Sequence, residues 1–194
     1  AFLSTPDPKE VYRSAAVGIS RFLIDLGSEQ SIDSVFIGFT NMRVDASFWL
    51  DKTDTMGGEN IAPIVTFQQG LVTSAEPRRH AVALAATPVT ARYLRLSVDK
   101  ASGLPLEIGR LLIGKRFEEP YEFKSGRRLI DLSERADLAG GGFGFGTAAI
   151  KAGYNFSFSD LSDSRLASLY ALARSVGNHA PVLVIEGGIG TIVH

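Results

Sequence analysis

The chain has 194 residues, with 20 Lys and Arg against 21 Asp and Glu, and 45% of its residues are hydrophobic. A net charge of −1 provides no overall positive field to hold a polyanion, which argues against nucleic-acid binding. The sequence has no cysteine, so disulfides, thiolate metal sites and cysteine nucleophiles are excluded. No apolar run reaches the roughly 18 to 20 residues that span a bilayer, so we expect no membrane insertion.

Short runs of alternating apolar and polar residues predict β-strands in the first part of the chain. The clearest run alternates with the period of about two that marks a half-buried strand. Its apolar residues lie on one face and its other residues on the opposite face: Met42, Val44, Ala46, Phe48 and Leu50 against Arg43, Asp45, Ser47 and Trp49. Further β-rich runs cover 22–26, 32–40, 64–68, 80–86, 92–98 and 106–113. Short strands separated by turn signals predict an antiparallel β-sandwich or barrel.

The pattern changes after Lys115, and we expect a β-sandwich domain over residues 1–117 and a small α+β module over 118–194. The second part holds predicted strands at 128–132 and 154–158 and one convincing helix. Ser162 can cap this helix, and Gly177 can end it in a left-handed conformation. A buried strand is expected at 182–185, after Pro181.

The glycine-rich tract 139–147 does not match a phosphate-binding loop. A Walker-type loop ends in Gly-Lys-Ser/Thr, but here Gly146 is followed by Thr147 and Ala148. The tract also lacks the third glycine of the dinucleotide fingerprint and a helix behind it. We interpret it as a loop or a β-edge with interleaved phenylalanines.

No group of residues has the spacing of a catalytic or metal site. His80, His179 and His194 lie far apart and form no metal-binding motif. The sequence has no G-x-S-x-G nucleophile elbow, and its carboxylates are scattered. We therefore expect no enzyme activity, no metal and no cofactor.

Trp49 is the only tryptophan and lies on the polar face of its expected strand. With Arg43 and Asp45 on the same face, it could stack on a sugar ring while its neighbours bond hydroxyls; the alternative is burial by a second sheet or a subunit. Arg78 and Arg79 are read as solvated loop charge, or as contacts to an acidic partner or an acidic glycan.

Four stretches resemble the discoidin-type, galactose-binding-like β-sandwiches. Residues 21–27 (RFLIDLG) and 32–39 look like the early strands of these jelly-roll domains, and 91–96 (ARYLRL) and 106–112 look like their late strands. Residues 106–114 (LEIGRLLIG) and 169–184 (LYALARSVGNHAPVLV) are in addition similar to phage and prophage tail proteins that carry this sandwich.

The resemblance implies a non-enzymatic structural component of a phage tail or baseplate, located in the virion. Its expected partners are other tail and baseplate proteins and further copies of itself, with a host glycan as an additional candidate. In that interpretation the glycine-rich tract supplies subunit contacts through Gly142, Phe143, Gly144 and Phe145. The alternative function is a carbohydrate-binding module that recognises a surface glycan.

Overall fold

The computed structural model of the chain describes residues 10–15, 17–43, 46–56, 61–65, 71–72, 79–99, 103–120, 126–131, 135–137, 143–145, 150–177 and 182–185. The chain divides into two compact units: residues 1–116 with 178–193, and residues 117–177 with His194. The assignment of 118–194 to a single module stays a prediction.

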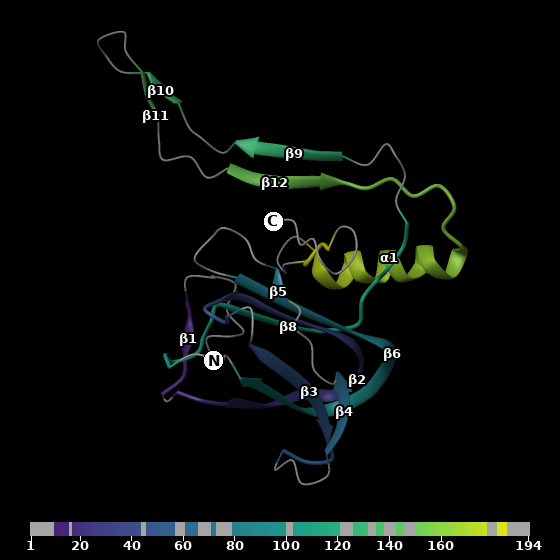
Figure 1. The fold of residues 1–194 in the computed structure, drawn as a ribbon. Helices are drawn as coiled ribbons and strands as arrows, with labels where there is room; N and C mark the ends of the chain where they lie inside the picture. The colour runs from purple at the N-terminus through teal and green to yellow at the C-terminus, as the bar shows by residue number, and fades with distance from the viewer. Residues whose placement is uncertain are drawn as a thin grey trace. The chain divides into compact units, whose positions relative to one another are not determined.

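The first unit is built from antiparallel strands (Figure 1). Its strands are β1 (Tyr12–Arg13), β2 (Ser20–Thr40), β3 (Ser47–Thr53), β4 (Ile61–Val65), β5 (Leu71–Val72), β6 (Arg79–Asp99), β7 (Glu107–Ile108) and β8 (Arg110–Gly114). Strands β4, β3, β6, β2 and β8 lie in that order in one sheet, in which β5 also pairs with β6, while β1 pairs with β7. The predicted mainly β, antiparallel fold class is confirmed.

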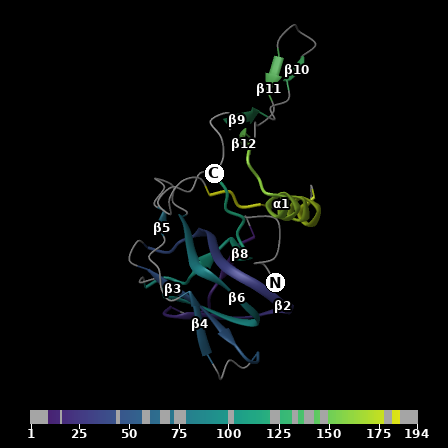
Figure 2. The same cartoon turned by 90° about the vertical axis from the view of Figure 1, so that its right-hand side faces the viewer.

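The long strands β2 and β6 run side by side and connect the two layers of the sandwich (Figures 1 and 2). The sequence predicts two separate strands in place of each. In the structure each pair of predicted strands forms one continuous strand. Register shifts after Asp25, Ile32 and Ile37 let the paired strands bend. The first shift contains Gly27, whose φ of 80° suits glycine. The bent sheet thus places its two halves face to face.

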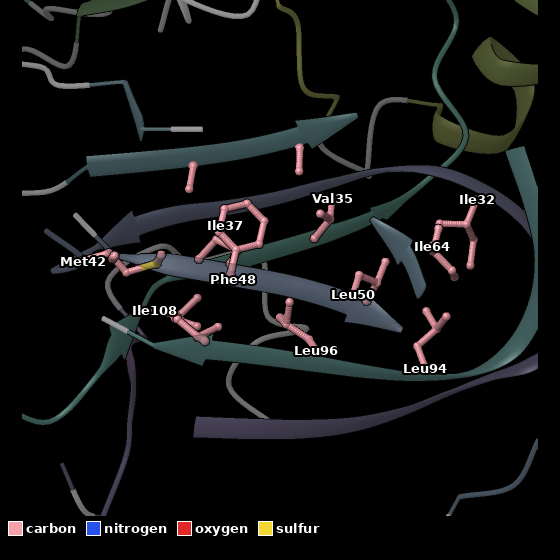
Figure 3. Close-up of a cluster of buried hydrophobic side chains, with 14 of the residues drawn as sticks. Ile32, Val35, Ile37, Met42, Phe48, Leu50, Ile64, Leu94, Leu96 and Ile108 are labelled. Atoms are coloured by element: carbon pink, nitrogen blue, oxygen red, sulfur yellow. The ribbon is translucent and has the colours of Figure 1, made fainter. Parts of the chain in front are cut away.

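The core lies between these halves and takes side chains from both (Figure 3). Its fully buried large side chains include Ile32, Val35, Ile37, Phe48, Leu50, Leu94, Leu96, Val98, Leu106 and Ile108. Burial is confirmed for four residues of the predicted apolar face, since Met42, Ala46, Phe48 and Leu50 are each 0% exposed; Val44 lies outside the described residues.

The strand predicted over 42–50 begins later than expected, at Ser47. The reason is a turn in which the backbone N–H of Ala46 donates to the carbonyl of Arg43 at 3.0 Å. A turn before the strand interrupts ladder pairing, yet both ends of the segment still deliver apolar side chains to the core.

Residues 182–185 pack on the first unit but form no strand there, which corrects the prediction of a buried strand. Leu183 and Ile185 contact the buried side chains of Phe36 and Val82. Phe36 and Val82 point away from the main core, because they alternate with the inward-facing residues of β2 and β6. The segment thereby covers a second apolar face of the sandwich.

The described part of the second unit contains two antiparallel strand pairs and one helix. Strand β9 (Gly126–Asp131) pairs with β12 (Ile150–Asn155), and β10 (Arg135–Asp137) pairs with β11 (Phe143–Phe145), both antiparallel. The predicted strand at 154–158 therefore begins earlier and ends at Asn155. Among the residues of 117–177 whose side-chain exposure the structure describes, none is buried.

Helix α1 (Asp163–Val176) has both predicted end signals. The Ser162 hydroxyl accepts a hydrogen bond from the backbone N–H of Arg165 at 3.4 Å. Gly177 has a φ of 52°, and its N–H donates to the carbonyl of Ala173 at 2.9 Å. The helix limits are thus set by local capping, as the sequence predicts.

Candidate functional site

The outward face of the layer formed by β3, β6 and the first half of β2 gathers polar and aromatic side chains. This face is opposite to the one that carries the buried Phe48, Leu50 and Leu96. Strand register aligns its residues in three cross-strand rows: Trp49–Ser97–Arg21, Asp51–Arg95–Leu23 and Thr53–Tyr93–Asp25. We call these nine residues the Trp49 face.

Trp49 is half-buried and lies beside an ion pair on this face. The Nη2 atom of Arg95 lies 2.9 Å from Oδ2 of Asp51, and Nε of Arg95 donates to the same oxygen at 3.3 Å. The Asp51 side chain is 7% exposed and that of Arg95 is 23% exposed. Both charged groups are therefore held in fixed positions in the row next to that of Trp49.

Ser97 lies between Trp49 and Arg21 in the first row and is 0% exposed. Its Oγ is the buried side-chain atom without a hydrogen-bond partner in the part of the chain that the structure describes. An unsatisfied buried hydroxyl costs about 1–3 kcal/mol. The unsatisfied Ser97 hydroxyl lowers the stability of the fold and lies in the same row as the half-buried Trp49. We therefore take this row as the centre of the candidate site.

Asp25 and Arg92 form a bidentate pair at the end of the Trp49 face. Nε and Nη2 of Arg92 donate to Oδ1 and Oδ2 of Asp25 at 2.9 and 3.0 Å. The hydrogen bonds from Arg92, together with one from the backbone N–H of Gly27, hold the pKa of the Asp25 carboxyl below its ordinary value. The same pairing raises the pKa of Arg92. The Arg92 guanidinium also lies 4.8 Å from the ring centre of Tyr93.

The structure places the predicted ligand residues at different points. Trp49 lies on the described sheet face, whereas Arg43 is exposed and precedes β3, in the turn that ends at Ala46. Asp45 and Arg78 lie outside the described residues, and Arg79 is placed only by its backbone, which pairs with Thr40. The grouping of Arg43 with Trp49 on one strand face is therefore replaced by the cross-strand neighbours Ser97 and Arg21.

The predicted assembly contacts lie partly outside the described residues. Gly142 is not described, and Phe143, Gly144 and Phe145 form β11, where they pair with Asp137, Ala136 and Arg135. Of the two interpretations of this tract, a β-edge with interleaved phenylalanines agrees with the described backbone.

Sequence reasoning missed Asp51, Arg95 and Ser97. A weak signal existed for each, because Asp51 continues the alternation of the 42–50 run, and Arg95 and Ser97 hold the polar positions of the 92–98 run. Their proximity depends on the register of β3 against β6, which alternation within one strand does not specify.

The described residues offer no other chemistry that stands out. They contain no group of three or more His, Asp or Glu placed to hold a metal ion. No helix among them is long and apolar enough to cross a membrane.

No protein-family model and no curated protein matches the chain. Solved structures to which it is similar include a pectin-binding carbohydrate-binding module, at 22% identity and a TM-score of 0.44, over 62% of this chain and 82% of that one. Another is chitosan-binding module 2, in complex with chitotriose, of a chitosanase/glucanase from Paenibacillus sp. IK-5, at 17% identity and a TM-score of 0.44, over 59% and 84%. A third is CpGH89CBM32-6 of Clostridium perfringens, at 13% identity and a TM-score of 0.44, over 59% and 82%.

Proposed function

We propose that the chain is a non-enzymatic carbohydrate-binding module and that a sugar ring binds on the Trp49 face. The observation that carries the proposal is the half-buried indole of Trp49 beside the Asp51–Arg95 ion pair and the unpartnered Ser97 hydroxyl. A sugar ring presents C–H groups on its faces and hydroxyls at its edge. An aromatic ring flanked by fixed polar groups complements both.

The Asp51–Arg95 ion pair holds the polar groups of this site in a fixed orientation. Because Asp51 and Arg95 are already paired and largely buried, little side-chain entropy is lost when a hydroxyl bonds to either group. Arg21, at the far end of the Trp49 row, is exposed and adds a positive charge. A sugar with a carboxylate at that end would gain an additional charge-assisted hydrogen bond.

The experiment is a glycan array with the full chain, followed by titration calorimetry with the glycan that binds. We expect Trp49→Ala to weaken binding about tenfold or more, the equivalent of roughly 1.4 kcal/mol, and Trp49→Phe to restore part of it. Tyr170→Ala is the matched control, since Tyr170 is a 61% exposed aromatic residue on α1, outside the Trp49 face. Unchanged binding by the Trp49→Ala variant rejects the site, and an array without any binding rejects the function.

A structural role in a phage tail or baseplate is the second candidate, and one observation favours it. Helix α1 contains no buried residue, and its Leu166, Tyr170 and Leu172 are 40%, 61% and 37% exposed. Apolar side chains displayed in this way suit contacts with neighbouring subunits. Co-purification of the chain with tail or baseplate proteins tests this role. Failure of the chain to join a reconstituted tail assembly would count against it, and this outcome is independent of glycan binding.

A further inference from the structure

The Trp49 face carries a positive charge that the face itself does not neutralise. Asp51 accepts its two hydrogen bonds from Arg95. Asp25 accepts two from Arg92, so each aspartate of the face already has an arginine partner. Arg21 is exposed, and its side chain has no ion pair or hydrogen bond in the part of the chain that the structure describes. One guanidinium is therefore left without a counter-charge.

The surroundings of Arg21 on this face leave its charge accessible. Across the sheet it lies next to Ser97, whose side chain is neutral, and along β2 it lies beside Leu23, which is 47% exposed. Asp99 lies on the same face one row further along, is half-buried and has an interaction of its own. A negatively charged ligand on this face would thus meet a guanidinium that it need not detach from another group.

Trp49 and Arg21 occupy the two ends of one cross-strand row. The row crosses β3, β6 and β2, so two strand spacings, about 10 Å in all, separate the two residues. A sugar ring stacked on the indole would lie between them, with its edge toward the arginine. A guanidinium presents paired N–H donors that match the two oxygens of a carboxylate. The row therefore suits a sugar that has a carboxylate on its ring.

A second aromatic residue extends the Trp49 face along the strands. Tyr93 is half-buried and lies in the third row, about 13 Å from the Trp49 row in the strand direction, which is more than the length of one sugar ring. The middle row holds the Asp51–Arg95 pair. Oδ1 of Asp51 and Nη1 of Arg95 have no partner in the described part of the chain, so this row keeps an acceptor and donors for sugar hydroxyls.

We propose that the Trp49 face binds an internal stretch of an extended polysaccharide of uronic acid units, which runs along β3 and β6. One unit stacks on Trp49 and directs its carboxylate to Arg21, the following unit bonds to the middle row, and a further unit contacts Tyr93. The inference rests on the proposed function and names its substrate class. Because the net charge of the chain is −1, a preference for this polyanion comes from the local arrangement and not from the overall field.

Titration calorimetry of the full chain with oligomers of galacturonate and of mannuronate, from one to six units, tests the charge preference. We expect the hexamer of at least one series to bind. Its methyl-esterified form has nearly the same shape without the charges and should bind about tenfold or more weakly. Arg21→Gln should lower the affinity for the acid form to that for the ester and leave the affinity for the ester unchanged. Arg174→Gln is the matched control, since Arg174 is an exposed arginine on α1, outside the Trp49 face.

The length of the oligomer tests the contact with Tyr93. Affinity should rise with each added unit until the oligomer reaches from Trp49 to Tyr93, because the later contacts form within a ligand that is already bound. Tyr93→Ala should remove the gain of the longer oligomers and leave the binding of a single unit unchanged. Tyr93→Phe keeps the ring and should keep the gain.

The outcomes separate this inference from the proposed function. A neutral glycan that binds as tightly as the acid oligomers, or an affinity for the acid oligomers that Arg21→Gln does not change, overturns the acidic substrate class and leaves carbohydrate binding on the Trp49 face in place. An affinity that is equal from one unit to six overturns the extended ligand. Absence of binding to any glycan rejects the proposed function, and this inference with it.

Discussion

At the scale of single residues, the Trp49 face contains side chains that do not favour the stability of the fold. The Ser97 hydroxyl is buried without a partner in the described structure, in a position where a smaller apolar side chain would fit. Its row neighbour Trp49 is only half-buried. Residues that carry a cost to folding are typical of surfaces shaped for binding.

We predict that Ser97→Ala raises the free energy of unfolding by about 1 kcal/mol, because it removes a buried hydroxyl without a partner and leaves no large cavity. Urea denaturation followed by tryptophan fluorescence measures the change. Thr40→Ala is the control: this buried hydroxyl accepts a hydrogen bond from the backbone N–H of Met42 at 3.3 Å, so its loss should destabilise the protein. Destabilisation by Ser97→Ala would show that its hydroxyl is satisfied.

The Asp25–Arg92 pair gives a prediction about pH. The pKa of Asp25 is lower in the folded chain than its ordinary value of 3.8, so the ionised carboxylate stabilises the folded state. This contribution is complete above pH 3.8 and is lost as the pH falls through the folded pKa. The melting temperature of Asp25→Asn should therefore lie below that of the wild type at pH 7, and the difference should shrink below pH 3.8. The effect is small, since the pair is exposed. A difference that grows on acidification would contradict this origin.

At the scale of elements, local capping residues set both ends of helix α1. Its apolar side chains, however, are not buried in a core. Apolar residues recur at 3/4 spacing along the helix, and none of them is buried: Leu166, Leu169, Tyr170, Ala173 and Val176. Tertiary packing normally supplies most of the stability of a helix. Capping must therefore carry an unusually large share of the stability of α1.

We predict that Ser162→Ala lowers the stability of α1 by about 1 kcal/mol through loss of the cap. Circular dichroism at 222 nm should show less helix in the folded protein. Ser168→Ala is the matched control: Ser168 donates to the carbonyl of Ser164 within the helix, and alanine there favours helix formation. Equal helix content in the wild type and the Ser162→Ala variant would mean that contacts to other parts hold α1 in place.

At the scale of the whole molecule, stability is concentrated in the sandwich. Its core includes Phe48, Leu50 and Leu96 at 0% exposed. By contrast, no residue of 117–177 whose side-chain exposure the structure describes is buried. Segments with few buried apolar contacts open locally at a lower free energy than the core does.

Hydrogen exchange of the full chain should therefore separate the two parts. We expect the amides of β3 and of 91–99 in β6 to exchange slowest, and those of β9 and β12 to exchange faster by an order of magnitude or more. Uniform protection over both parts would contradict the difference in burial.

The sequence determined the antiparallel β class, the buried face around Phe48 and both ends of α1. Each of these rests on local physics: alternation within a strand decides which side chains can face a core, and capping residues satisfy the free backbone groups of the nearest helix turn. It also placed Trp49 on the strand face opposite to Phe48.

Only the tertiary structure decided the continuity of β2 and β6, the late start of β3 and the neighbours of Trp49. Register shifts merged the predicted runs into long bent strands, and pairing across the sheet brought Ser97 beside Trp49 and Arg95 beside Asp51. The continuity of these strands and the neighbours of Trp49 depend on contacts between residues far apart in the chain, such as Asp51 and Arg95, which are 44 positions apart. A period of two within each strand permits several registers, and packing of the common core selects one of them.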